Sequence, residues 1–328
     1  MNPTQWHSQR RVCLLAVLAM LISPVAMAGA WAKGTIKIVV PFQAGGSTDF
    51  LARALGQKLN ERLQQAVVVE NKPGANGTLG GAYVAKAAPD GLTLLIAQSG
   101  FASNPSLFKN LSYDQTTDLV PVSLMASGPL VLTVNSNFPA KTVKELIALA
   151  KEKPGEINFG SAGTGSLPHL APELFNLMAD TRMTHIPYKG SGAALTDVLS
   201  GQVPVYYMNL ILSLPYLKSG KLRALAVTSP QRSSIAPDLP TLAESGLSGY
   251  DMTTWYGLFA PGKMPKALVH AIQQEFAQVL RQSDVVEKFA SDGVNVVAST
   301  PEAFGEFLGR EVEKFSKIIQ AAGIRASD

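Results

Sequence analysis

The chain has 328 residues, of which 46% are hydrophobic and only 16% are charged. This length accommodates two α/β lobes of roughly 120 to 150 residues each, with enough apolar material for two cores. The formal net charge of +4 comes from Lys and Arg residues that are scattered and form no basic stripe, which argues against a nucleic-acid-binding protein.

The first 28 residues have the layout of a secretory signal peptide. Two arginines precede an apolar run, residues 12–21, which is followed by Pro24 and by the small-residue site Ala26-Met-Ala28. We expect export, with cleavage at Ala28 or within about four residues of it. A membrane anchor is less favoured, because the run is short and Pro24 interrupts it. The single cysteine, Cys13, leaves with this segment, so the exported chain is expected to have no disulfide and no cysteine ligand.

A strand, a glycine-rich turn and a helix follow. The apolar run Ile38–Val40, ended by Pro41, is typical of a buried strand, and leucines at helical spacing after residue 50 predict an amphipathic helix. The turn between them reads Gly45-Gly-Ser-Thr-Asp49. Its glycines leave the backbone open to a ligand, and its three polar side chains are expected to cap the helix. Free N–H groups and the helix dipole at such a terminus favour an anion.

A second unit of the same design lies later in the chain. Residues 157–169 again run from a strand through a Gly/Ser turn, Ser161–Ser166, into a helix. In both units a further strand, a loop, a short helix and a last strand complete a βαβαβ pattern, with the loops at residues 71–77 and 189–192. Two units that each carry a glycine-rich helix N-terminus predict two lobes facing each other across a cleft.

The remaining segments predict how the lobes are joined. Residues 120–134 are long enough for two strands, separated at Ser127–Pro129, and are expected to lead from lobe one into lobe two. Met252–Ala260 is the natural return strand, and two helices then finish lobe one, one over about residues 265–282 and one capped by Thr300. We therefore predict two hinge strands and the following division: lobe one, discontinuous, at residues 33–127 and 252–328, and lobe two at residues 128–251.

Several longer motifs occur in a fixed order. They are Pro41-Phe-Gln-Ala-Gly-Gly-Ser-Thr-Asp49, Val69-Glu-Asn-Lys-Pro-Gly-Ala-Asn-Gly77, Ser161-Ala-Gly-Thr-Gly165 with His169, His185-Ile-Pro-Tyr-Lys-Gly190 and Trp255-Tyr-Gly-Leu-Phe-Ala-Pro261. With these motifs the mature chain closely resembles the Bug-type substrate-binding proteins of tripartite tricarboxylate transporters. The resemblance implies an α/β fold of the type II periplasmic binding protein class, a "Venus flytrap" that closes in the periplasm on a small carboxylate or a related metabolite.

The resemblance also implies that the two glycine-rich loops contact the ligand. The cation Lys189, the amide Asn209 and the indole Trp255 are further candidates. The candidate ligand-binding residues are Phe42, Ala44, Gly45, Gly46, Ser47, Thr48, Asp49, Ser161, Gly163, Thr164, Gly165, His169, Lys189, Asn209 and Trp255. We expect Asp49 to organise its loop, because an uncompensated carboxylate would repel an anionic ligand. Three of these residues have alternative interpretations. His169 could orient its loop, Lys189 could be a solvated surface residue, and Trp255 could pack in the core.

One position departs from the family pattern. Many members carry an acidic residue ahead of an Asn on the strand where this chain reads Met208-Asn209. Met208, with Ile211 and Leu212, makes that wall more apolar. This favours an aliphatic or aromatic carboxylate over an amino acid or a hydroxylated ligand.

Motifs for catalysis are scarce. The chain has no Gly-x-Ser-x-Gly elbow. Ser106-Leu-Phe-Lys109 matches a Ser-x-x-Lys motif, but the Ser-Asp-Asn and Lys-Thr-Gly motifs that accompany it in enzymes are absent from the sequence. The histidines are too scattered for a metal site. We therefore expect a monomeric solute-binding protein without a metal or cofactor, whose partners are the membrane permease subunits of a tripartite transporter. A periplasmic sensor or scavenger without a transporter stays open as an alternative, and a hydrolytic enzyme is the less favoured one.

Overall fold

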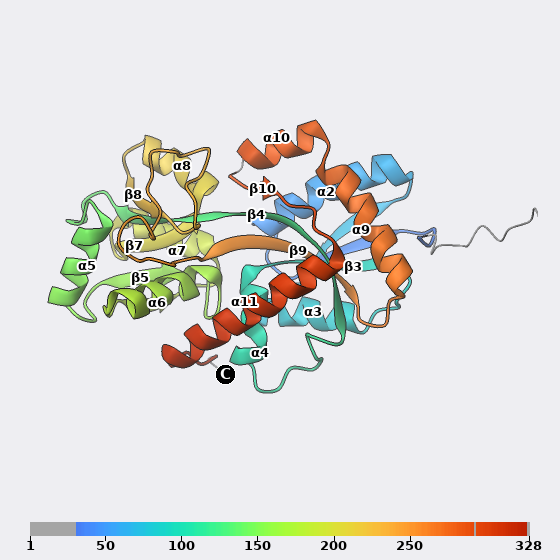
Figure 1. Ribbon diagram of the computed structural model, residues 1–328, viewed down its shortest axis with the longest axis horizontal. Helices are drawn as coiled ribbons and strands as arrows, with labels where there is room; N and C mark the ends of the chain where they lie inside the picture. Colours follow the sequence, from blue (N-terminus) through green and yellow to red (C-terminus); the bar gives the residue numbers. More distant parts are fainter. Residues whose placement is uncertain (1–30, 292, 327–328) are drawn as a thin grey trace, which may run out of the picture.

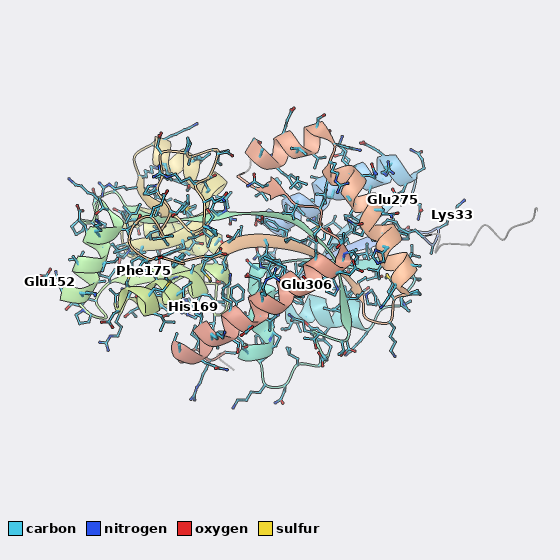
Figure 2. All side chains as sticks on the ribbon, in the orientation of Figure 1. Lys33, Glu152, His169, Phe175, Glu275 and Glu306 are labelled. Atoms are coloured by element: carbon cyan, nitrogen blue, oxygen red, sulfur yellow. The ribbon has the colours of Figure 1, made fainter. Side chains whose placement is uncertain are left out.

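The computed structural model describes residues 31–291 and 293–326, so the predicted signal peptide and Cys13 lie outside the described residues. A mixed sheet of ten strands extends through both lobes, with helices on its two sides (Figure 1). Glu152 on α5 and Glu275 on α9 lie toward opposite ends of the molecule (Figure 2). No helix within the described residues is long and apolar enough to cross a bilayer.

Lobe one is built on the predicted βαβαβ unit. Its elements are β1 (Ile36–Val40), α2 (Ser47–Leu63), β2 (Val67–Asn71), α3 (Thr78–Ala85) and β3 (Thr93–Gln98). Both β2 and β3 pair in parallel with β1, as the crossover helices require. Three short segments were not predicted: η1 (Ala75–Gly77), η2 (Ser99–Ser103) and α4 (Asn104–Leu107).

Lobe two repeats this design. Its elements are α5 (Val143–Glu152), β5 (Asn158–Ser161), α6 (Leu167–Ala179), β6 (Thr184–Pro187), α7 (Ser191–Ser200), β7 (Val205–Asn209), α8 (Leu210–Lys218) and β8 (Leu222–Val227). Strand β5 pairs in parallel with both β6 and β7. Thr142 caps α5, because its side chain accepts a hydrogen bond from the N–H of Glu145.

Two strands connect the lobes. These are β4 (Leu119–Asn135) and β9 (Thr253–Pro261), which pair antiparallel from Leu119 to Pro129. Beyond Pro129, β4 pairs with β7 and β8 of lobe two. The prediction of two strands separated at Ser127–Pro129 is wrong, because β4 is continuous. Position 128 requires a glycine because of a neighbouring segment and not because of a turn. A Cβ at this position would collide with the carbonyl oxygen of Gly293.

The C-terminal segment returns to lobe one, because β9 also pairs with β3. It continues as α9 (Lys266–Leu280), α10 (Ser283–Ser291), β10 (Asn295–Val296) and α11 (Pro301–Ala321). The sequence did not predict α10 and β10. Thr300 accepts a hydrogen bond from Ala303 N–H and caps α11 as predicted. Helix α11 contacts β4, η2 and α4, and it also reaches α6 of lobe two (Figure 1).

The contact between α11 and β9 yields a stability prediction. A Cβ at Gly257 on β9 would overlap the Phe304 ring of α11, so Gly257→Ala should destabilise the fold by about 1–3 kcal/mol. Gly309 lies on the exposed side of α11, where a Cβ meets no atom within 4 Å. Gly309→Ala should therefore stabilise the fold by ~0.5–1 kcal/mol. Urea unfolding measures both effects, and equal shifts of the same sign would contradict this packing.

Candidate ligand-binding site

A cavity of about 790 Å³ lies between the two lobes. Lobe one contributes residues 41–48, the loop 73–77 and the end of β3, and lobe two contributes the starts of α6 and α7 with parts of β7 and α8. Three helices, α2, α6 and α7, thus begin at the cavity wall. Their first N–H groups have no acceptor within the helix, and the helix dipoles place partial positive charge there.

The structure brings about half of the predicted ligand-binding residues to this cavity. Those that line it are Phe42, Ala44, Gly45, Gly46, Ser47, Thr48, Lys189 and Asn209. Those that do not are Asp49, Ser161, Gly163, Thr164, Gly165, His169 and Trp255. Met208 and Leu212, which the sequence placed on an apolar wall, also line the cavity.

Asp49 holds the first glycine-rich loop, residues 42–49, through hydrogen bonds and does not line the cavity. The expectation that Ser47, Thr48 and Asp49 cap α2 is wrong, since Gly46 is the N-cap and no side chain caps it. Instead the Asp49 carboxylate accepts hydrogen bonds from the Gly45 N–H at 3.0 Å, from Arg53 and from Asn71. Burial acts to raise the pKa of Asp49, but these three hydrogen bonds outweigh it and the pKa is lowered. The ionised carboxylate is compensated by Arg53, so it organises the loop as expected.

The second loop reaches the cavity only through Ala162 and the first turn of α6, residues 166–168. The Ser161 hydroxyl accepts from the Gly163 N–H at 3.0 Å, and Ser166 donates from its hydroxyl to the Gly163 carbonyl at 2.6 Å. These contacts hold the turn together. Ser161, Gly163, Thr164 and Gly165 are not among the residues that line the cavity, and direct ligand contact by them stays a prediction.

Two stacked imidazoles support this loop. The ring centroids of His169 and His185 are 3.6 Å apart, and the rings are nearly parallel. His169 Nδ1 accepts from the Gly165 N–H at 3.1 Å, and His185 Nε2 lies 2.6 Å from the Ser161 hydroxyl. Burial, with a smaller effect of His169, lowers the pKa of His185 to about 3. His169 lies on α6 and is buried, and it is not among the residues that line the cavity, so its hydrogen bond with Gly165 favours the loop-orienting alternative.

Trp255 belongs to the core and not to the cavity wall. It has no exposed surface, and its Nε1–H donates to Glu311 Oε2 at 2.9 Å. The rings of Phe304 and Phe307 pack edge-on against it. The preceding residue, Thr254, lines the cavity. Successive residues of a strand face opposite sides, so this strand presents its threonine and not its tryptophan to the ligand site.

Sequence reasoning missed two parts of the wall. They are the loop 73–77 and the α7 start at residues 190–193. Both segments follow the second strand of their βαβαβ unit. Because the two units share one design, this equivalent position could have indicated that both segments line the cavity. Among the described lining residues, Lys189 is the only Lys or Arg. Within the described chain, no group of three or more His, Cys, Asp or Glu could hold a metal ion. The arrangement is suited to hydrogen-bonding an anion through backbone dipoles.

Comparison with known proteins agrees with this geometry. A family model described as "Tripartite tricarboxylate transporter family receptor" matches residues 51–324. Protein BugT of Bordetella pertussis is 38% identical over 320 residues, which cover 95% of this chain and 98% of BugT. The structure of R. palustris Rpa4515 with adipate has 33% identity and a TM-score of 0.84, and covers 90% of this chain and all of its own. MatC from Rhodopseudomonas palustris with bound malate has 31% identity and a TM-score of 0.79, with 87% and 98% covered.

The buried histidine pair predicts a pH effect on stability. His185 is lowered to a pKa of about 3 in the folded state, whereas an unfolded histidine titrates near ~6.5. The unfolded chain therefore binds a proton first as the pH falls, and the stability that neutral His185 contributes above ~6.5 is lost between there and 3. The unfolding free energy of the parent, relative to His185→Gln, should fall by about 1–3 kcal/mol from pH 7 to pH 4.

Urea unfolding at several pH values measures this difference. His270, an exposed residue on α9, supplies the control, because its replacement by Gln removes a histidine without removing a buried one. A difference between parent and His185→Gln that stays constant from pH 7 to pH 4 would show that His185 is not held neutral.

Proposed function

Because the chain belongs to the tripartite tricarboxylate transporter receptor family, we propose that it captures a small carboxylate in the cavity between its lobes. It then presents the bound carboxylate to the membrane permease subunits of a transporter. Family membership makes it a solute-binding receptor, and receptors of this family are periplasmic. Export through the N-terminal signal peptide and a monomeric state are parts of the same proposal.

The observation that carries the proposal is the convergence of α2 and α6 on one cavity. Ser47 and Thr48 lie in the first turn of α2, and Leu167 lies in the first turn of α6. Their N–H groups have no intrahelical acceptor, so they are available to carboxylate oxygens. The helix dipoles add attraction for negative charge. One ligand carboxylate can thus be held by both lobes without an arginine.

The rest of the cavity suits the hydrocarbon part of a ligand. Leu130, Met208, Leu212 and Tyr216 form an apolar wall on the lobe-two side. Burying aliphatic or aromatic groups there is favourable by about 25 cal/mol per Å². The neighbours solved with adipate and with malate support a carboxylate ligand. We propose an aliphatic or aromatic carboxylate, selected by the size of this apolar part.

Capture would proceed by lobe closure. The lobes are joined by β4 and β9, and a ligand that contacts both lobes stabilises the closed arrangement over the open one. For this motion we keep the lobe division proposed from the sequence: residues 33–127 and 252–328 move against residues 128–251.

Thermal unfolding of the exported chain against a carboxylate panel tests the class of ligand. The panel contains mono-, di- and tricarboxylates, aromatic acids and acidic amino acids. A ligand at 100 times its Kd stabilises the folded state by ~2.7 kcal/mol, so aliphatic or aromatic carboxylates should raise the Tm by several degrees. Absence of any shift, together with no ligand released on denaturation and detected by mass spectrometry, would refute the carboxylate proposal.

Gly46→Val tests the site. A Cβ at Gly46 makes only ordinary contact, with Gln43 O at 3.5 Å, so the fold should be retained. The added side chain would occupy the ligand's approach to the α2 N–H groups, and binding should weaken at least a hundredfold, which corresponds to ~2.7 kcal/mol. Calorimetric titration measures the Kd, with Gly309→Val on the exposed side of α11 as control. Unchanged affinity in Gly46→Val would reject the first loop as a ligand contact.

A further inference from the structure

The second glycine-rich loop, residues 161–166, rests on lobe one. Ser103 of η2 is fully buried, and its hydroxyl donates to the carbonyl oxygen of Gly165 at 3.0 Å. A Cβ at Gly165 would collide with Leu107 Cδ1 and lie 2.9 Å from Ser103 Oγ. Gly165 also has a φ of +79°, in the left-handed region that favours glycine. A glycine is therefore required here both by the turn and by the close contact between lobes.

Asn76 and the Ser103 hydroxyl belong to one hydrogen-bond network beside the second loop. Asn76 Nδ2 lies 3.0 Å from Ser103 Oγ, and an amide nitrogen can only donate. The two hydrogens of Asn76 Nδ2 have three acceptors within reach, the Gly100 carbonyl at 2.8 Å, Asn104 Oδ1 at 2.9 Å and Ser103 Oγ at 3.0 Å. Two carbonyl oxygens are within reach of the Ser103 hydroxyl, that of Gly100 at 2.7 Å and that of Gly165 at 3.0 Å. The Ser103 hydroxyl, next to the Asn76 amide, thus lies within hydrogen-bond distance of one main-chain carbonyl from each lobe.

Asn76 is itself held in an uncommon backbone conformation. Ala75 and Asn76 have φ values of 44° and 51°, and they lie between Gly74 and Gly77, whose φ values are also positive. Such a conformation persists in non-glycine residues only where the surroundings enforce it. Asn104 enforces it here, because Asn76 Nδ2 donates to Asn104 Oδ1 at 2.9 Å and Asn104 Nδ2 donates back to the Asn76 carbonyl. The strained loop also lines the cavity.

We propose that Asn76 and Ser103 are positioning residues that hold the second loop in its ligand-binding geometry. The Gly165 carbonyl is bound by Ser103, and the Gly165 N–H is bound by His169. With both groups fixed, the backbone that leads into Ser166 cannot rotate, and the first turn of α6 stays directed at the cavity. This role rests on the proposed function, because it concerns how the carboxylate site is kept in place. It makes Ser103, which does not line the cavity, a determinant of affinity.

Ser103→Ala tests the role, with Ser123→Ala as the matched control. Ser123 is also fully buried, and its hydroxyl donates to the Ser299 carbonyl at 2.9 Å, but it lies on β4 outside the cavity lining. Both variants should lose similar stability. Only Ser103→Ala should weaken binding, by about fivefold in Kd and mainly through faster dissociation. The probe is the carboxylate with the largest thermal shift in the panel, and stopped-flow kinetics gives both rate constants.

Hydrogen exchange in the ligand-free protein gives a second readout. Peptides covering residues 161–167 should exchange faster in Ser103→Ala than in the parent and in Ser123→Ala. Asn76→Gly, which tolerates the positive φ, should reproduce this result. Exchange equal to that of the control overturns the proposal, and faster exchange with unchanged Kd overturns its link to ligand capture. If no carboxylate binds the parent, the proposed function fails, whereas the exchange comparison still decides whether Ser103 positions the loop.

Discussion

N–H groups at the start of a helix have no acceptor within that helix, and this constraint organises the cleft. Helices α2, α6 and α7 begin at the cavity, and none of their N-caps carries a side-chain hydrogen bond. The polar side chains that might have served as caps are used elsewhere. Asp49 binds the backbone of its own loop, and the hydroxyl of Ser166, the N-cap residue of α6, donates to the Gly163 carbonyl. The described side chains therefore cap none of these three helices, and hydrogen bonds with Asp49, His169 and Ser166 hold the loops that precede α2 and α6.

A site made of backbone dipoles distinguishes poorly between one anion and another, because every carboxylate presents the same oxygens. Selectivity has to come from the remaining surface, where Leu130, Met208 and Leu212 offer shape and apolar area but few hydrogen bonds. Hydroxyl or ammonium groups directed at this wall would lose water without gaining a partner. In the proposed function, backbone N–H groups of both lobes hold the carboxylate and the apolar surface on lobe two selects the rest of the ligand.

Local patterns predicted the two βαβαβ units, the two connecting strands and the cap at Thr300, because strand and helix periodicity and capping are properties of short segments. The break expected at Ser127–Pro129 was wrong. Gly128 does not mark a turn there; it leaves room for the main chain of Gly293, which the sequence does not show to be near. The position of Trp255 was left open between the cleft and the core, because the sequence does not show which face of a strand is directed at a cleft. The loop 73–77 was missed because its course depends on successive left-handed residues, which tertiary contacts enforce against local preference.

Helix α11 has a consequence for the folding unit. One hydrophobic cluster contains Phe101 and Phe259 of the lobe-one side, Phe159 and Phe175 of lobe two, and the buried face of α11 with Phe315. The lobes therefore share a core on this side of the sheet. Isolating either lobe would expose to water the part of this core that the other lobe covers, which is unfavourable. The two lobes should therefore unfold together in one cooperative transition. An exchanged lobe would also have to pack against helix α11, which contacts both lobes.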